Sequence, residues 1–278
     1  MIELSRNVTF GQYINNGSAI TSMDPRVKIA SAILLITLVS FIGSFAAFAL
    51  CLLFCINLQW ASHISVPYVL RSFKPIMIFL IIIYVIEVLF YYSPTQHTTL
   101  IWQWGIFAVS WEGIIRSAAT IVRVLFLYYF ASMLMFTTSL VDLTDGSEAL
   151  FSPLQRIGVP VNALVMVLVI AFKFVPILVA EVERLMKAQA ARGVRFDKGN
   201  IFRRSIKFAS LLVPLFLSGF RRAEMLSMAM EARCYGSHRG WRRSKRRELR
   251  LKRYDVLALS LVIVFCIVTV VVNFVAPF

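Results

Sequence analysis

The sequence is poor in the residues that build metal centres and disulfide frameworks. Its 278 residues include only 3 histidines and 4 cysteines. The histidines are isolated from one another, which favours ordinary loop or interface positions. Three of the cysteines lie in apolar runs, where a thiol behaves as a small hydrophobic side chain: Cys51, Cys55 and Cys266. We therefore expect no metal site, no disulfide framework and no bound cofactor.

Motifs for catalysis are also missing. The chain has no G-x-x-x-x-G-K-[ST] phosphate-binding loop, so it should not hydrolyse nucleotides by itself, and it has neither H-E-x-x-H nor G-x-S-x-G. Asp142, Asp145 and Glu148 recur at every third position, but acidic residues at the start of a helix more often complement its dipole than bind a metal. A membrane enzyme is therefore disfavoured.

Negative charge is scarce, and positive charge is unevenly spread. The sequence has 14 Asp and Glu against 29 Lys and Arg, a formal net charge of +15. Residues 137–253 hold 22 of those 29 cations, which argues against a nucleic-acid partner. With 59% hydrophobic residues, 23 phenylalanines and a mean hydropathy of +0.77, the chain is an integral membrane protein. The cationic segment is typical of a cytoplasmic face beside anionic lipid and soluble partners.

The apolar runs predict an all-α, polytopic membrane protein with about five transmembrane helices. The almost uncharged run 29–61 has Lys and Arg on both flanks, so by the positive-inside rule it crosses twice, turning near 43–44. The loop 93–111 has no Lys or Arg and should face outward. An N-terminal membrane region, 1–136, is expected to hold four crossings, near 29–43, 45–61, 75–92 and 112–136.

The remainder is predicted to be a coupling region, 137–253, followed by a C-terminal transmembrane helix in 254–278. This order places the N-terminus and 137–253 in the cytoplasm and the C-terminus outside. A short helix is expected over 142–151.

Two long helices are expected within this region, ending at Gly193 and Arg233. Each contains one proline, Pro176 or Pro214, and is apolar before it and amphipathic after it. The alternative makes 161–180 and 206–220 ordinary crossings, which their charges disfavour.

Both long helices end in an alanine-arginine pair. The two sequences are Ala191-Arg192-Gly193 and Ala232-Arg233-Cys234. A guanidinium at a helix end can form two charge-assisted hydrogen bonds with one carboxylate, which predicts two docking sites for partners. The alternative is that each arginine bonds the carbonyls at the end of its own helix.

A second set of charges suggests a different function. Arg116 and Arg123 are seven residues apart and share roughly one face of the 112–136 crossing, and Glu87 on the preceding crossing is a candidate partner for Arg123. Charged residues inside the membrane usually mark a partner or a water-filled path. These three residues would line the substrate path of a conventional permease, the alternative function.

Six short segments, which together extend over nearly the whole chain, carry a family resemblance: Phe10–Tyr13, Asp24–Lys28, Thr137–Ser139, Asp142–Asp145, Ser152–Leu154 and Met186–Gly193. They resemble the transmembrane coupling subunit, or T component (EcfT), of energy-coupling factor transporters. The first arginine segment matches the Ala-Arg-Gly form of that family. The second has Cys234 in place of the glycine, which bears on the local cap geometry and not on the role of Arg233.

The resemblance implies a membrane scaffold without a transported substrate of its own, in the cell membrane. Its partners would be two ABC-type ATPase subunits, held by the two arginine segments, and a substrate-binding S component. ATP binding would move the coupling helices and reorient the S component, so that a vitamin or another micronutrient enters. Methionines repack readily against varied partners, so four of them are candidate S-component contacts, with core packing as the alternative: Met186, Met225, Met228 and Met230.

Overall fold

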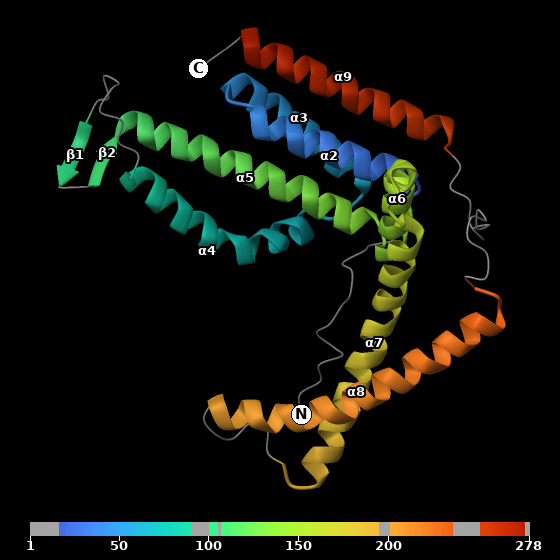
Figure 1. Ribbon diagram of the computed structural model, residues 1–278. Coiled ribbons are helices and arrows are strands. Elements are labelled where there is room, and N and C mark those ends of the chain that lie inside the picture. Colours follow the sequence, from blue (N-terminus) through green and yellow to red (C-terminus); the bar gives the residue numbers. More distant parts are fainter. Residues whose placement is uncertain (1–16, 91–99, 105–106, 195–200, 236–250, 276–278) are drawn as a thin grey trace. The chain divides into compact units, whose positions relative to one another are not determined.

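The computed structural model describes residues 17–90, 100–104, 107–194, 201–235 and 251–275 (Figure 1). The chain forms two compact units. One, which we call the bundle unit, comprises residues 11–157 and 249–278. The other, the long-helix unit, contains the described residues 158–194 and 201–235.

The bundle unit consists mainly of helices in its described part. Its elements, in chain order, are α2 (Pro25–Phe41), α3 (Phe45–Ser62), α4 (Val66–Phe90), β1 (Leu100–Trp104), β2 (Phe107–Ser110), α5 (Trp111–Thr137), α6 (Leu140–Phe151), the 3-10 helix η1 (Ser152–Ile157) and α9 (Arg253–Val275). The all-α class is confirmed. The helices follow the expected ranges closely, apart from α4.

Polar side chains set the starts of four of these helices. Asp24 accepts a hydrogen bond from the backbone N–H of Arg26 at the start of α2, where Pro25 occupies the first turn. Ser44, Ser110 and Ser139 cap α3, α5 and α6 in the same manner. Such caps satisfy N–H groups that have no partner within the helix.

Two features of the bundle unit differ from the sequence-based expectation. Helix α4 begins at Val66 and carries Pro75 in its interior, whereas the crossing was expected to start at Pro75. Membrane helices tolerate an internal proline because neighbouring groups satisfy the freed carbonyl. The expected outward loop contains an antiparallel hairpin of β1 and β2, with Trp104 paired with Phe107. Alternating aromatic residues favour a strand over a coil.

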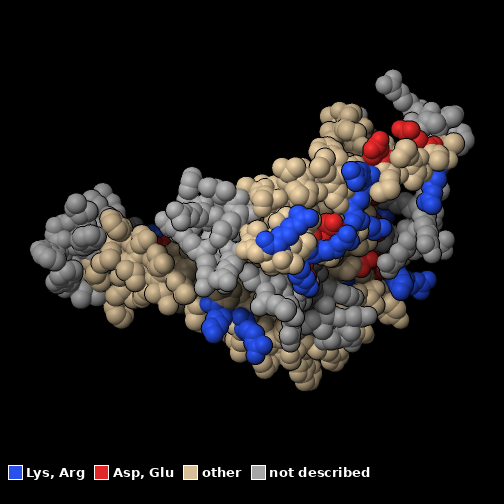
Figure 2. Space-filling model, turned by 90° about the horizontal axis from the view of Figure 1, so that it is seen from below, with Lys and Arg blue, Asp and Glu red and all other residues tan. Residues whose placement is uncertain are grey.

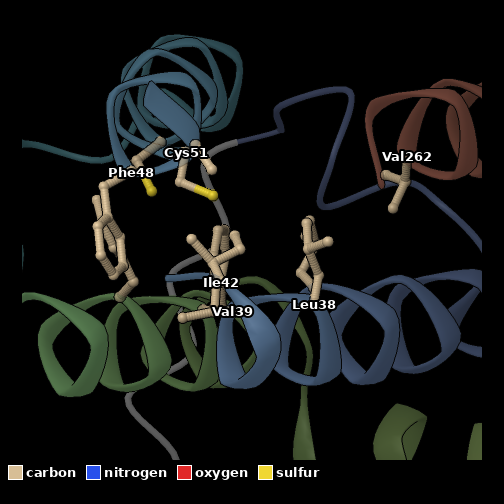
Figure 3. Packing of buried hydrophobic residues seen from close by; sticks show 11 residues of the cluster. Leu38, Val39, Ile42, Phe48, Cys51 and Val262 are labelled. Atoms are coloured by element: carbon tan, nitrogen blue, oxygen red, sulfur yellow. The ribbon is translucent and has the colours of Figure 1, made fainter. Parts of the chain in front are cut away.

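The core of the bundle unit lies where α2, α3, α5 and α9 meet. Leu38 and Val39 of α2, with Ile42 just after it, point toward Phe48 and Cys51 of α3, and Val262 of α9 lies beside them (Figure 3). Phe126 of α5 stacks on Phe48 with ring centroids 6.3 Å apart. Helices inside a bilayer gain stability from such packing and from hydrogen bonds rather than from the hydrophobic effect.

The turn between α2 and α3 is held by side chains from two other helices. Arg123 of α5 donates from Nη2 to the carbonyl of Ile42 at 2.7 Å. The Asn273 Oδ1 atom of α9 accepts from the N–H groups of Gly43 and Ser44 at 2.9 and 3.0 Å. These contacts satisfy backbone groups for which the bilayer offers no water.

We expect Asn273→Leu to destabilise the protein by about 1–3 kcal/mol, because two backbone N–H groups lose their acceptor. Asn57→Leu is a matched control, since Asn57 is exposed and bonds only a carbonyl of its own helix. Thermal unfolding in detergent micelles measures the difference. Equal melting temperatures for the two variants would contradict this role of Asn273.

Five helices of the described residues are long and apolar enough to cross a membrane: α3, α4, α5, α7 (Val161–Ala191) and α9. The number of candidate membrane-spanning helices therefore agrees with the expected five or so, but the helices are not all the expected ones. Helix α2, with 17 residues, is shorter than these, whereas α7 qualifies by length and composition. That composition favours the alternative in which residues 161–180 cross the membrane. The cytoplasmic assignment of the whole segment 137–253 stays a prediction.

The long-helix unit is built on α7 and α8 (Ile201–Ala232), which contain Pro176 and Pro214 in their interiors. The two helices cross each other (Figure 1). Met186 and Leu211 are buried against each other at the crossing. Arg222 of α8 and Glu181 of α7 form an ion pair of 3.3 Å beside it. This crossing joins the two helices mechanically.

Candidate docking site for partner subunits

Helix α7 ends in a Schellman motif centred on Gly193. The Gly193 N–H donates to the Ala190 carbonyl at 3.0 Å, and the Val194 N–H donates to the Gln189 carbonyl at 3.1 Å. Gly193 has a φ of +88°, in the left-handed region that glycine adopts without strain. Backbone groups therefore satisfy the last carbonyls of this helix.

Helix α8 ends in the same motif, although it has no glycine there. The Cys234 N–H donates to the Glu231 carbonyl at 2.8 Å, and the Tyr235 N–H donates to the Met230 carbonyl at 2.9 Å. Cys234 has a φ of +57°. The cysteine thus keeps the cap geometry that glycine gives the first helix, at a cost of roughly 1–2 kcal/mol for a left-handed L-residue.

We expect Cys234→Gly to stabilise the end of α8 by about 1 kcal/mol and Gly193→Ala to destabilise the end of α7 by a similar amount. Hydrogen exchange at the amides of Tyr235 and Val194, which close the two motifs, measures both effects. Slower exchange at Tyr235 and faster exchange at Val194 are the expected results. A change of the same sign at both amides would contradict this account.

The two arginines lie on the surface at equivalent positions of these motifs. Arg192 and Arg233 are both exposed, as are the neighbouring Ala191, Ala232 and Cys234. Within the part of the chain that the structure describes, neither guanidinium has a hydrogen-bond or ion-pair partner. The alternative, in which each arginine bonds its own helix end, is not observed, because the backbone already fills that role.

The charged side chains on the described surface are mostly Lys and Arg. The face of the molecule in Figure 2 carries many more Lys and Arg than Asp and Glu side chains. Such a surface attracts partners with acidic grooves and speeds their association.

The four candidate methionines fall into two groups. Met225 and Met228 are 58% and 56% exposed on α8, and Met230 is half-buried. Met186 is 7% exposed and packs against Leu211. The structure therefore favours the packing alternative for Met186 and leaves the α8 methionines accessible to a partner.

An apolar groove of about 340 Å³ lies between α7 and α8, and the sequence analysis missed it. Its walls are Leu178, Leu212, Leu215, Phe216, Gly219, Phe220 and Ala223. Gly219 opens it, because no other atom lies within 4 Å of the place where a Cβ would stand. A glycine between large apolar residues of a helix is the sequence signal that could have indicated this groove.

The charges proposed for a permease path have other contacts. The expected Arg123–Glu87 pair is wrong: Arg123 bonds the Ile42 carbonyl, and Glu87 Oε1 accepts from the Thr120 hydroxyl at 3.1 Å. Arg116 lies one turn before Thr120, and its carbonyl accepts from the same hydroxyl. Arg123 thus serves the α2–α3 turn and does not form the expected substrate path with Glu87.

Asp142, in the first turn of α6, follows the helix-dipole interpretation. The Ser139 hydroxyl donates to Asp142 Oδ2 at 2.7 Å and accepts from the Asp142 N–H at 3.1 Å. Among the described residues, no three His, Cys, Asp or Glu side chains are grouped so that they would hold a metal ion.

Comparison with known proteins agrees with these features. Residues 16–242 match the family CbiQ, described as cobalt transport protein. Three curated relatives, each named energy-coupling factor transporter transmembrane protein EcfT, are similar over most of their length. Those of Ruminiclostridium cellulolyticum and Clostridium kluyveri are 37% and 36% identical, covering 94% of this chain and 95% and 96% of the relatives. That of Bacillus subtilis is 32% identical, covering 87% of this chain and 89% of the relative.

Proposed function

This chain belongs to the CbiQ family and is the transmembrane component of an energy-coupling factor transporter, and from that premise we propose how it couples. Two ABC-type ATPase subunits bind the ends of α7 and α8 on the cytoplasmic side. An S component that carries the vitamin or another micronutrient binds the same two helices. The chain is a multi-pass, non-catalytic subunit that passes movement from the ATPases to the S component.

The observation that carries the proposal is the pair of equivalent, exposed arginines. The Schellman motifs at Gly193 and Cys234 fix the backbone on both sides of each arginine without using its side chain. Each guanidinium therefore keeps all five N–H donors for a partner carboxylate. Two copies of one docking element on one chain fit two copies of one kind of partner.

The lengths of the two helices suit the transfer of movement. Their 31 and 32 residues correspond to about 46–48 Å each at the helical rise. The Met186–Leu211 contact and the Glu181–Arg222 ion pair join them at their crossing. A displacement at one arginine therefore changes the crossing as well as its own helix.

The surface proposed for the S component is the exposed side of α8. The groove at Gly219 offers an apolar depression, and Phe216, Phe220 and Met225 are all more than half exposed. An exposed apolar surface of this kind is typical of a protein or lipid contact. Flexible methionines near it would allow several S components to bind the same scaffold.

Native mass spectrometry of the tagged chain, purified from its own host, tests this assignment. We expect one copy of the chain with two ATPase subunits and one S component. A conventional permease would instead be released without ATPases and would bind its substrate alone. Recovery of the chain without any ATPase subunit would overturn the proposal.

A further inference from the structure

Four charged side chains gather where helix ends of the bundle unit meet: Asp24, Lys28, Asp142 and Asp255. Asp24 and Lys28 are each 7% exposed, and Asp255 is 2% exposed. Asp255 Oδ1 accepts from the Asp24 N–H at 3.1 Å. Lys28 Nζ donates to the carbonyls of Thr21 and Thr137 at 3.0 and 2.9 Å.

The sign of each charge suits the helix end beside it. Asp24 caps α2, Asp142 lies in the first turn of α6, and Asp255 lies in the first turn of α9. Lys28 bonds the carbonyl of Thr137, the last residue of α5. Acidic groups are favoured at helix N-termini and basic groups at C-termini. Because buried charges are costly when unpaired, the cluster favours one arrangement of these four helices.

Close packing adds to this constraint on α6. A Cβ atom at Gly146 would lie 2.9 Å from Ile29 Cδ1 and 3.0 Å from Pro25 Cβ, so α6 lies directly against α2. Thr144, two residues after Asp142 on α6, is 4% exposed. Helix α6 is therefore part of the bundle and has little freedom to move alone.

The helices that this cluster joins adjoin two connections between the units. The chain leaves the bundle unit after η1, which follows α6, and returns to it just before α9. Asp142 lies on α6, ahead of the first connection, and Asp255 lies on α9, after the second. Lys252, just before α9, also donates its N–H to Asp255 Oδ2 at 2.9 Å.

We propose that Lys28 is a positioning residue for coupling, which together with Asp24, Asp142 and Asp255 fixes α6 and the start of α9 to α2. Movement that reaches α6 or the start of α9 then acts on the whole bundle and is not lost by bending of either helix away from α2. This inference rests on the proposed function, because it assigns the cluster a part in transmitting that movement.

Spin-label distances between α2 and α6 test the proposal in the assembled complex. Labels are placed at Ser40→Cys and Leu150→Cys, both exposed, in a Cys234→Gly background that removes the exposed native thiol. The distance distribution is recorded with and without MgATP for Lys28→Met and Asp255→Asn. Lys74→Met, a change of an exposed lysine on α4, is the matched control.

We expect a narrow distribution that ATP does not change in the unmodified cluster and in Lys74→Met. In Lys28→Met and Asp255→Asn, the distance distribution should broaden or shift when ATP is added. A loss of stability alone would not make the distance depend on ATP. Asp255→Asn keeps an oxygen acceptor at this position. If Lys28→Met does not fold, the distances in Asp255→Asn therefore test the proposal. If Lys28→Met and Asp255→Asn show the same ATP-independent distance distribution as the unmodified protein, the proposal is overturned. It is also overturned if the distance in the unmodified protein changes with ATP. Absence of ATPase subunits from the purified complex would instead reject the proposed function.

Discussion

Replacing both arginines, Arg192→Glu and Arg233→Glu, should abolish association with the ATPase subunits. Each guanidinium is exposed and unpaired in the described part of the chain, and its helix end is already capped by backbone bonds. Loss of one member of a desolvated charge pair costs roughly 2–5 kcal/mol, and charge reversal adds repulsion to that loss. Two such losses lower the association constant by at least about a thousandfold. Co-purification of the ATPases with the tagged chain measures it.

Arg184→Glu is the matched control, because Arg184 is exposed on α7 but lies within the helix and not at its end. It makes the same change of charge and should retain the ATPases. Each single variant should show an intermediate loss, since the two sites are equivalent in structure. Full retention of ATPases by the double variant, or equal loss from Arg184→Glu, would show that the helix ends are not the docking points.

The helices were predictable because their signals are local. Long apolar runs with cationic flanks predicted the ranges of α2, α3, α5 and α9 to within a few residues, and the alanine-arginine pairs predicted where α7 and α8 end. The start of α4 was not predictable, because Pro75 breaks a helix in water and is tolerated in a membrane helix. The hairpin of β1 and β2 depends on pairing between segments, which no local pattern specifies.

The position of Arg192 and Arg233 at helix ends was predictable, but the geometry of those ends was not. The repeated alanine-arginine pair located Arg192 and Arg233, yet the equivalence of their caps rests on Cys234 adopting a left-handed φ that its residue type disfavours. The groove at Gly219 and the Lys28 cluster join segments far apart in sequence, so they required the fold. For Arg123, charge alone suggested Glu87, whereas its guanidinium donates to the carbonyl of Ile42, the residue after α2.

A second large effect is expected from pH, through Lys28. It lies in the first turn of α2, before the apolar run, and burial lowers the pKa of its ammonium to about 8 although Asp142, Asp255 and Asp24 oppose that shift. Between pH 8 and the ordinary lysine value, the unfolded chain binds a proton that the folded chain has released. Stability therefore increases with pH across this window, by up to about 2–3 kcal/mol. Below pH 8 both states are protonated, and the cost of burial is fully present.

The apparent melting temperature of the solubilised chain between pH 7.5 and 9.5 measures this increase, and Lys28→Met isolates its source. The charged groups that face Lys28 are the carboxylates of Asp142, Asp255 and Asp24. A neutral amine keeps two N–H donors, which still serve the carbonyls of Thr21 and Thr137. The unmodified chain and the exposed-lysine control Lys74→Met should therefore gain stability without losing the cluster, and Lys28→Met should lack that gain. If the melting temperature of Lys28→Met rises with pH as steeply as that of the unmodified chain, another group titrates. Burial of the Lys28 ammonium would then not cost the folded protein this free energy.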